Sequence, residues 1–187
     1  MKYAQWFYGG VVASGVVLAG CGSHAAEPRP PARIETIRAG ARARDFRAQD
    51  IDGRTISLSS YLRKDVVLLT FCSTWCEPCV AEFPHLRRIY EQNRENGFVI
   101  LAISLDGPET VANVPGFARR NHLLFPMVID ADSNIATLYN PKKTAPLGIL
   151  IDRAGTIVAI HEGYTPGDEE QLSREIASAL GMSSQAL

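Results

Sequence analysis

Residues 66–90 read VVLLTFCSTWCEPCVAEFPHLRRIY and predict a strand, a cysteine pair and a helix in direct succession. Residues 66–71 form a largely apolar run with β-branched members, which is typical of a central strand buried on both faces. From Cys79 onward, apolar side chains recur at helical spacing, so we predict a helix that begins near Cys76 and ends before Gly97. The cysteine pair therefore lies where a buried strand passes into a helix.

Cys76 and Cys79 have the spacing of a redox pair, because two intervening residues bring both sulfurs within bonding reach across one helical turn. Unpaired N–H groups and the positive end of the helix dipole favour a thiolate at Cys76. We therefore expect Cys76 to attack and Cys79 to resolve the mixed disulfide. The alternatives are a structural disulfide or half of a zinc site, but zinc needs about four ligands. The four histidines are scattered, so no metal and no cofactor are expected.

The rest of the chain alternates between strand and helix patterns. Asp52-Gly53 predicts a hairpin between strands at 46–49 and 55–58. Further strands are expected at 98–104, 125–129, 148–151 and 157–161, and helices at 109–121, 133–139 and 169–180. This order predicts an α/β domain with a mixed central sheet flanked by helices and an added N-terminal β-hairpin.

Composition narrows the class of protein. The 187 residues, 46% hydrophobic and 21% charged, are typical of one globular domain with a short extension. Lys and Arg total 19 against 20 Asp and Glu, so no nucleic-acid partner is expected. Of the four cysteines, one stands at position 21 and three lie between 72 and 79. That clustering indicates a reactive cysteine site rather than a set of structural disulfides.

The N-terminus has the pattern of an export signal. Lys2 precedes an uncharged, largely apolar stretch at 3–20 whose strongest part is too short to span a membrane. The stretch ends on Leu18-Ala19-Gly20-Cys21, which resembles the lipobox of bacterial lipoproteins, in which the cysteine is diacylated. Cys21 would then anchor an extracytoplasmic protein to a bacterial membrane. The alternative is an ordinary secretory signal with Cys21 incidental.

These patterns divide the chain into three parts. Residues 1–20 are the predicted signal peptide, and 21–43 are the predicted lipidated cysteine and a Pro-, Ala- and Arg-rich linker that we expect to be poorly ordered. Residues 44–187 are the predicted folded domain, which we expect to be a monomer.

Between about Phe46 and Leu180 the chain resembles the ResA/TlpA-type extracytoplasmic thiol–disulfide oxidoreductases of the thioredoxin superfamily. The resemblance rests on Asp52-Gly53, Leu58, Phe71 through Pro84, Phe125-Pro126, Ala145-Pro146, Ile149 through Asp152, and Gly155. It implies a thioredoxin fold in which Pro146 is a cis-proline opposite the disulfide and the Ala145 backbone pairs with bound substrate. Trp75, Glu77 and Pro78 are the other expected substrate contacts.

Two departures from the family pattern affect the site. Cys72 stands where the family usually has tryptophan, which leaves a third thiol near the pair. Around Pro146, the usual preceding glycine is missing and Leu147 replaces the usual threonine, so the shape of the substrate groove is left open.

Glutamates near the pair suggest the direction of electron flow. Glu77 and Glu82 oppose a thiolate, which favours a reductant. The resemblance implies a protein disulfide substrate such as that of apocytochrome c, and a membrane thiol transporter as electron donor. Glu82 also continues the inward helical stripe of Leu86 and Ile89, so we interpret it as a proton acceptor for Cys79. The alternative is a side chain at the edge of the stripe that reaches water.

Three other functions remain open from the sequence. A peroxiredoxin-like peroxidase would use Cys76 alone, and a copper-delivery protein could use Cys72 and Cys76 with His161 as third ligand. Against copper, Cys72 fits a small buried apolar residue at the end of a strand. The third possibility is a binding module whose cysteine pair has lost its redox role.

Overall fold

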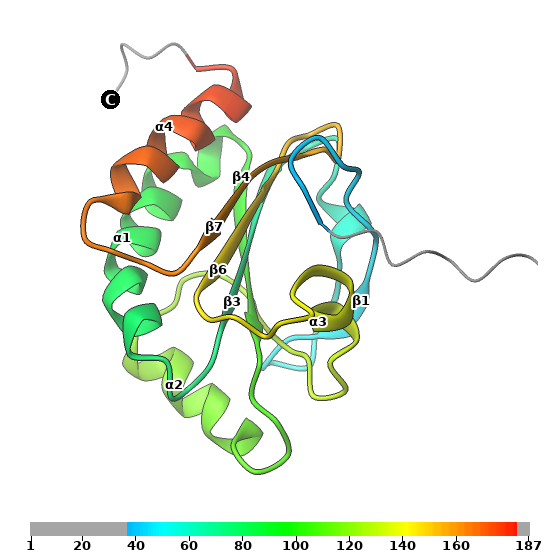
Figure 1. Ribbon diagram of the computed structural model, residues 1–187, viewed down its shortest axis with the longest axis vertical. Helices are drawn as coiled ribbons and strands as arrows, with labels where there is room; N and C mark the ends of the chain where they lie inside the picture. Colours follow the sequence, from blue (N-terminus) through cyan, green and yellow to red (C-terminus); the bar gives the residue numbers. More distant parts are fainter. Residues whose placement is uncertain (1–36, 183–187) are drawn as a thin grey trace, which may run out of the picture. The chain divides into compact units, whose positions relative to one another are not determined.

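A computed structural model describes residues 37–182 (Figure 1). Its main sheet is mixed, with strand β3 at the centre. In spatial order the strands are β5 (Met127–Ile129), β4 (Phe98–Ser104), β3 (Val66–Cys72), β6 (Leu147–Ile151) and β7 (Ile157–Glu162). β3 is parallel to β4, which is parallel to β5, while β6 is antiparallel to both β3 and β7. The predicted mixed sheet is confirmed.

Helices and a hairpin cover the two faces of this sheet (Figure 1). The longer helices are α1 (Glu77–Asn93), α2 (Val114–Arg120) and α4 (Asp168–Leu180), which pack on one face. The other face carries α3 (Asn134–Tyr139) and the two-stranded sheet of β1 (Arg47–Gln49) and β2 (Thr55–Ser57). Short 3₁₀ turns complete the list: η1 (Leu58–Ser60), η2 (Arg94–Asn96) and η3 (Val111–Asn113).

The alternation of side chains along β3 explains why both faces are covered. Val66 and Leu68 belong to the core beneath α1, whereas Val67 and Leu69 belong to the core beneath the hairpin. All four are at most 1% exposed. Burying one such side chain contributes about 1.5–3 kcal/mol. A strand that is apolar on both faces is therefore stable only in the middle of a sheet covered on both sides.

The β1–β2 hairpin turns at Gly53, whose φ of 77° is a left-handed conformation that glycine adopts without strain. Asp50 holds this turn: its carboxylate accepts hydrogen bonds from the N–H groups of Asp52 and Arg54 and from the Arg54 guanidinium. The predicted hairpin is confirmed.

Two elements are shorter than predicted. The helix expected at 109–121 is α2 preceded by the turn η3, and Pro115 lies in the first turn of α2, where its missing N–H breaks no helical hydrogen bond. The strand expected at 125–129 pairs only from Met127 onward, since Pro126 has no N–H to donate to a ladder.

The segment 37–43, which the sequence placed at the end of the linker, packs against the domain. The N–H of Gly40 donates to Ile157 O at 2.8 Å, and that of Ala43 donates to Gly155 O at 2.8 Å. Both bonds attach the segment to the β6–β7 turn. Within 37–182, none of the helices has the length and apolarity needed to cross a membrane. The predicted signal peptide and Cys21 lie outside the described residues.

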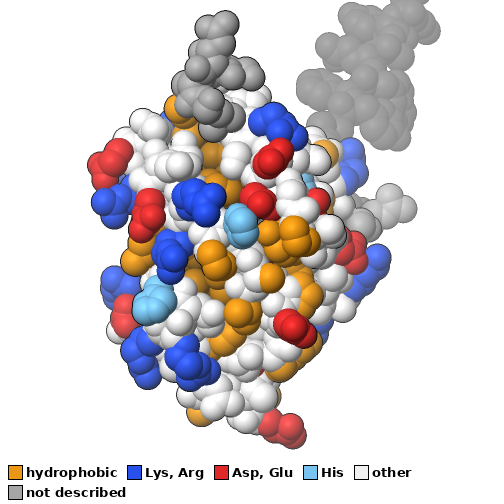
Figure 2. Space-filling view, turned by 90° about the vertical axis from the view of Figure 1, so that its left-hand side faces the viewer, with side chains coloured by type: hydrophobic (Ala, Val, Ile, Leu, Met, Phe, Trp, Pro, Cys, Tyr) orange, Lys and Arg blue, Asp and Glu red, His pale blue; other side chains and the backbone are white. Residues whose placement is uncertain are grey.

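Basic, acidic and apolar side chains are mixed on the face covered by α1 and α4 (Figure 2).

Candidate active site

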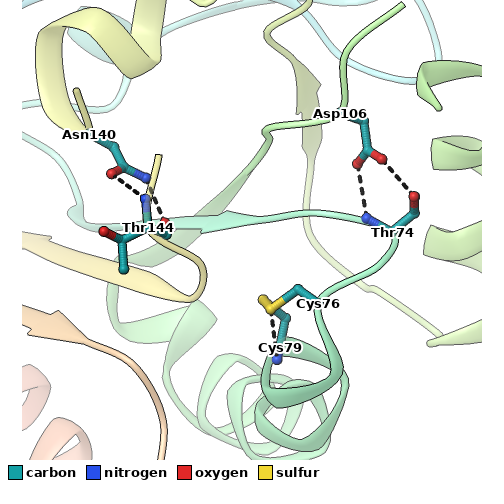
Figure 3. Close-up of a disulfide and its surroundings, with 6 residues drawn as sticks. All are labelled: Thr74, Cys76, Cys79, Asp106, Asn140 and Thr144. Carbon is teal, nitrogen blue, oxygen red and sulfur yellow. Dashed lines mark hydrogen bonds between the residues drawn. A yellow bond between two sulfur atoms is a disulfide. The ribbon is translucent and has the colours of Figure 1, made fainter. Parts of the chain in front are cut away.

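Cys76 and Cys79 are joined by a disulfide at the start of α1 (Figure 3). Cys76 is the N-cap residue, with extended φ and ψ of −87° and 99°, and its Sγ accepts a hydrogen bond from the N–H of Cys79 at 3.2 Å. Cys79 is 0% exposed, whereas Cys76 keeps 4%. The Cys76 sulfur is therefore the slightly more accessible of the two and lies at the N-terminal end of the helix, where unpaired N–H groups stabilise a negative charge.

The residues around the pair are accessible. Trp75 is 67% exposed, and Glu77 and Pro78 are also exposed. Pro78 lies in the first helical turn, where its missing N–H breaks no helical hydrogen bond. Val80, one helical turn after Cys76, is another exposed apolar residue. A partner that approaches Cys76 would therefore meet apolar side chains together with the Glu77 carboxylate.

Pro146 follows a cis peptide bond after Ala145, as the resemblance implied. Because β6 is antiparallel to β3 with Leu147 opposite Phe71, residues 145–146 lie beside the loop that leads from β3 to Cys76. Ala145 packs against the core cluster that contains both cysteines. The substrate-contact role assigned to these residues stays a prediction.

An asparagine holds the loop before Pro146, and the sequence did not identify it. Asn140 is 2% exposed. Its side chain donates to Thr144 O at 2.7 Å and accepts from Thr144 N at 2.9 Å (Figure 3). The amide thus pairs with the backbone as a neighbouring strand would. An asparagine after a short helix is typical of any turn, so only the contact with Thr144 in the folded protein reveals its role.

An aspartate holds the loop before Cys76, and it was also missed. Asp106, just after β4, accepts hydrogen bonds from the N–H and the hydroxyl of Thr74 (Figure 3). One signal could have found it: a polar residue directly after a buried parallel strand lies at the same edge of the sheet as the residue that follows the neighbouring strand.

Glu82 lies on α1, one turn after Cys79. Burial, together with the negative charge of Asp168, raises the pKa of its carboxyl to about 7. Its Oε2 is buried without a hydrogen-bond partner among the described residues. A cavity of about 20 Å³, lined in part by Glu82, His161 and Tyr164, lies beside it. That volume holds about one water, which could carry a proton to or from the carboxylate.

Cys72 differs from the pair in its surroundings. It is a free, fully buried thiol, and burial, with the charges of Asp106 and Glu82, raises its pKa well above the usual range. His161 contacts Glu175 at 2.6 Å. Within residues 37–182, no group of three His, Cys, Asp or Glu side chains is arranged to hold a metal ion. The arrangement does not support the copper hypothesis.

Fold and site together define a class: a thiol–disulfide oxidoreductase of thioredoxin fold. The family model of the AhpC/TSA family matches residues 39–160. Over 138 residues the chain is 37% identical to the thiol-disulfide oxidoreductase ResA of Halalkalibacterium halodurans, covering 74% of each chain. The chain therefore belongs to the AhpC/TSA family and, within it, to the ResA-type thiol-disulfide oxidoreductases.

Other relatives agree. The chain is 35% identical to ResA of Geobacillus thermodenitrificans, over 68% of this chain and 71% of that one. A crystal structure described as the thiol:disulfide interchange protein DsbE of Chlorobium tepidum has a TM-score of 0.72 and 30% identity, and covers 78% of this chain and 100% of its own. These findings confirm the family, the fold and the enzyme class predicted from the sequence.

Proposed function

We propose that this protein reduces disulfide bonds in exported proteins, with Cys76 as the attacking thiolate. The observation that carries the proposal is the placement of Cys76 Sγ at the N-terminus of α1, with Cys79 fully buried behind it. A thiolate at a helix N-terminus is stabilised and can reach a substrate, while a buried thiol can reach only its neighbour.

The reaction takes two exchange steps. The Cys76 thiolate attacks one sulfur of the substrate disulfide, so a mixed disulfide forms and the other substrate sulfur leaves as a thiolate. Cys79 then loses its proton and attacks Cys76 Sγ, which forms the Cys76–Cys79 disulfide and releases the second substrate thiolate. Both substrate thiolates take up protons. Two electrons pass from the dithiol to the substrate, and a membrane thiol donor returns them to the enzyme.

Glu82 is the proposed acceptor of the Cys79 proton. One helical turn places the two side chains on the same face of α1. A carboxyl with a pKa of about 7 can take up and release a proton near neutral pH. Its negative charge also opposes a thiolate, which keeps the dithiol a reductant rather than an oxidant.

The substrate is proposed to bind between Trp75 and Pro146, with its backbone along Ala145. Trp75, Glu77 and Pro78 offer the exposed surface on the helix side. The ResA resemblance suggests apocytochrome c as one such substrate.

The enzyme would act outside the cytoplasm, tethered through lipidated Cys21. A Cys21→Ser precursor should stay unlipidated and leave the detergent-extracted mature fraction, and unchanged processing and partitioning would contradict the anchor.

Trapping in cells tests the proposal as a whole. In Cys79→Ser the mixed disulfide cannot be resolved, so substrates should accumulate on Cys76 and be released by dithiothreitol. The Cys76→Ser/Cys79→Ser double variant is the control for non-covalent association. Adducts that form equally in the double variant, or steady peroxide consumption by Cys79→Ser without any adduct, would contradict a disulfide reductase and favour the peroxidase alternative.

A further inference from the structure

The loop between β3 and α1 is tied to the end of β4 by two successive contacts. The N–H of Leu105 donates to Cys72 O at 2.8 Å. One residue after Leu105 and two residues after Cys72, Asp106 accepts from Thr74: its Oδ2 from the N–H at 3.0 Å and its Oδ1 from the hydroxyl at 2.6 Å (Figure 3). We call the Asp106 and Thr74 pair the loop clamp. It fixes the loop two residues before Cys76.

The carboxylate of the clamp is itself held in place. Asp106 is 1% exposed, and the hydroxyl of Ser104 donates to its Oδ2 at 2.9 Å. In return, the N–H of Asp106 donates to Ser104 Oγ at 3.1 Å. Ser104 ends β4 directly opposite Cys72 in the sheet. The carboxylate therefore receives three hydrogen bonds and is oriented by the paired ends of β3 and β4.

The position of Thr74 is transmitted to the reactive sulfur through one tight turn. The N–H of Cys76 donates to Ser73 O at 3.1 Å, so Thr74 and Trp75 are the central residues of that turn. Trp75 is 67% exposed and contributes little packing to the loop. The turn delivers Cys76 to the N-cap position, where its Sγ meets the N–H of Cys79.

We propose that Asp106 is a positioning residue: through Thr74 it keeps the Cys76 sulfur at the N-terminus of α1 after the disulfide is reduced. The inference rests on the proposed attack by Cys76. In the oxidised protein a covalent bond ties Cys76 to the helix. Reduction removes that bond, and the loop clamp then holds the thiolate within reach of the helix N–H groups that stabilise it.

Asp106 can affect the Cys76 thiol pKa in two ways, through its charge and through the position that it gives the sulfur. The two effects have opposite signs, so variants can separate them. A buried negative charge near Cys76 opposes its thiolate, so neutralising Asp106 without moving the loop lowers the thiol pKa. Losing the clamp raises the thiol pKa, because the sulfur moves away from the helix N–H groups. Asp106→Asn is the neutral variant that keeps the clamp: its amide oxygen can accept from Thr74 N–H while its amide nitrogen donates to Thr74 Oγ1. Asp106→Ala removes both the clamp and the charge, so any rise of the Cys76 thiol pKa in this variant occurs against the charge effect and reports the loss of position.

The experiment is the pH dependence of alkylation of the reduced full-length protein by iodoacetamide, with Cys76 and Cys79 resolved by mass spectrometry. In Asp106→Ala the Cys76 profile should shift to higher pH and alkylation at pH 7 should slow about tenfold, the effect of one pKa unit. In Asp106→Asn the rate should stay within about threefold of wild type or rise, since half a pKa unit is about threefold.

Asp50→Ala is the matched control, because Asp50 is also buried and accepts three hydrogen bonds, but in the β1–β2 turn. It should lose stability and keep the wild-type Cys76 profile. If Asp106→Ala does not fold, Thr74→Val replaces it: loss of the hydroxyl bond should slow Cys76 alkylation about threefold, and Thr74→Ser should restore it.

The outcomes separate this inference from the function on which it rests. If Cys79 reacts faster than Cys76 in the wild type, the proposed attack by Cys76 is wrong. If Cys76 is the faster thiol and folded Asp106→Ala or Thr74→Val keeps the wild-type profile, the positioning role is wrong. A slowing in Asp106→Asn as large as in Asp106→Ala, or an equal slowing in Asp50→Ala, also contradicts it.

Discussion

The end of β3 and the start of α1 are only four residues apart, yet they give their cysteines opposite properties. Cys72 is enclosed by the core, and burial together with two nearby carboxylates raises its pKa and keeps it a neutral thiol. Cys76 caps a helix whose free N–H groups stabilise a thiolate. The reactivity of a cysteine in this stretch therefore depends on the burial of its sulfur and on the charges and backbone N–H groups around it, and not on how close it lies to the other cysteines in the sequence.

The largest expected difference is in activity. Cys76→Ser should slow reduction of a model disulfide by about 10³-fold or more, as loss of a nucleophile does. Cys72→Ala should keep the wild-type rate, because the buried thiol meets no substrate. Both rates can be followed by stopped-flow mixing of reduced protein with oxidised glutathione. Substantial activity in Cys76→Ser, or loss of activity in folded Cys72→Ala, would contradict the assignment of Cys76 as the reactive thiol and Cys72 as the unreactive one.

The next effect concerns Glu82, whose charge acts on Cys72 and lies one turn from Cys79. The wild-type rate should rise through a pH of about 7 as Glu82 ionises and becomes able to accept a proton. Glu82→Gln should lose that inflection and be about tenfold slower at neutral pH. Its thiols should also titrate at lower pH. Glu91→Gln, a substitution of an exposed residue on the same helix, is the control. If the pH–rate profile of Glu82→Gln superimposes on that of Glu91→Gln, Glu82 does not take part in the mechanism.

Glu82 also predicts how stability depends on pH. Its pKa rises from 4.5 to about 7 on folding, so between these values the folded state binds more protons than the unfolded state. The free energy of unfolding should therefore fall as pH rises from about 4.5 to about 7. The unfolding free energy of Glu82→Gln minus that of wild type should therefore be about 1–3 kcal/mol larger at pH 8 than at pH 4.5. Urea unfolding at both pH values measures this, and an equal difference at both would contradict the raised pKa.

The smallest effect is the packing contribution of Cys72. Removing its sulfur from a fully buried site should cost about 1 kcal/mol of unfolding free energy. Chemical denaturation of the reduced protein checks it, with the exposed Val158→Ala on β7 as the control for a surface truncation. A stability unchanged by Cys72→Ala would show that the strand end is less tightly packed than its burial indicates.

Local patterns were sufficient to predict most of the fold. The apolar run of β3, the spacing of apolar residues along α1 and the Asp52-Gly53 turn each depend on neighbours in the sequence, and all three predictions are confirmed. Boundaries were less certain where proline intervened. Pro115 stands in the first turn of a shorter helix and Pro126 directly before a shorter strand, two places where a missing N–H costs no regular hydrogen bond.

The cysteine pair was visible in the sequence because its chemistry needs two cysteines at a fixed spacing on one helix. The groups that hold it were decided only by tertiary structure. Asp106 is 32 residues from Thr74 and meets it because β3 and β4 are parallel and end at the same edge. Burial, together with the charge of Asp168 on α4, raises the pKa of Glu82, and the charge acts there because α4 packs against α1. Hydrogen bonds and charges act over a few ångströms, so which residues they join is set by how distant segments pack.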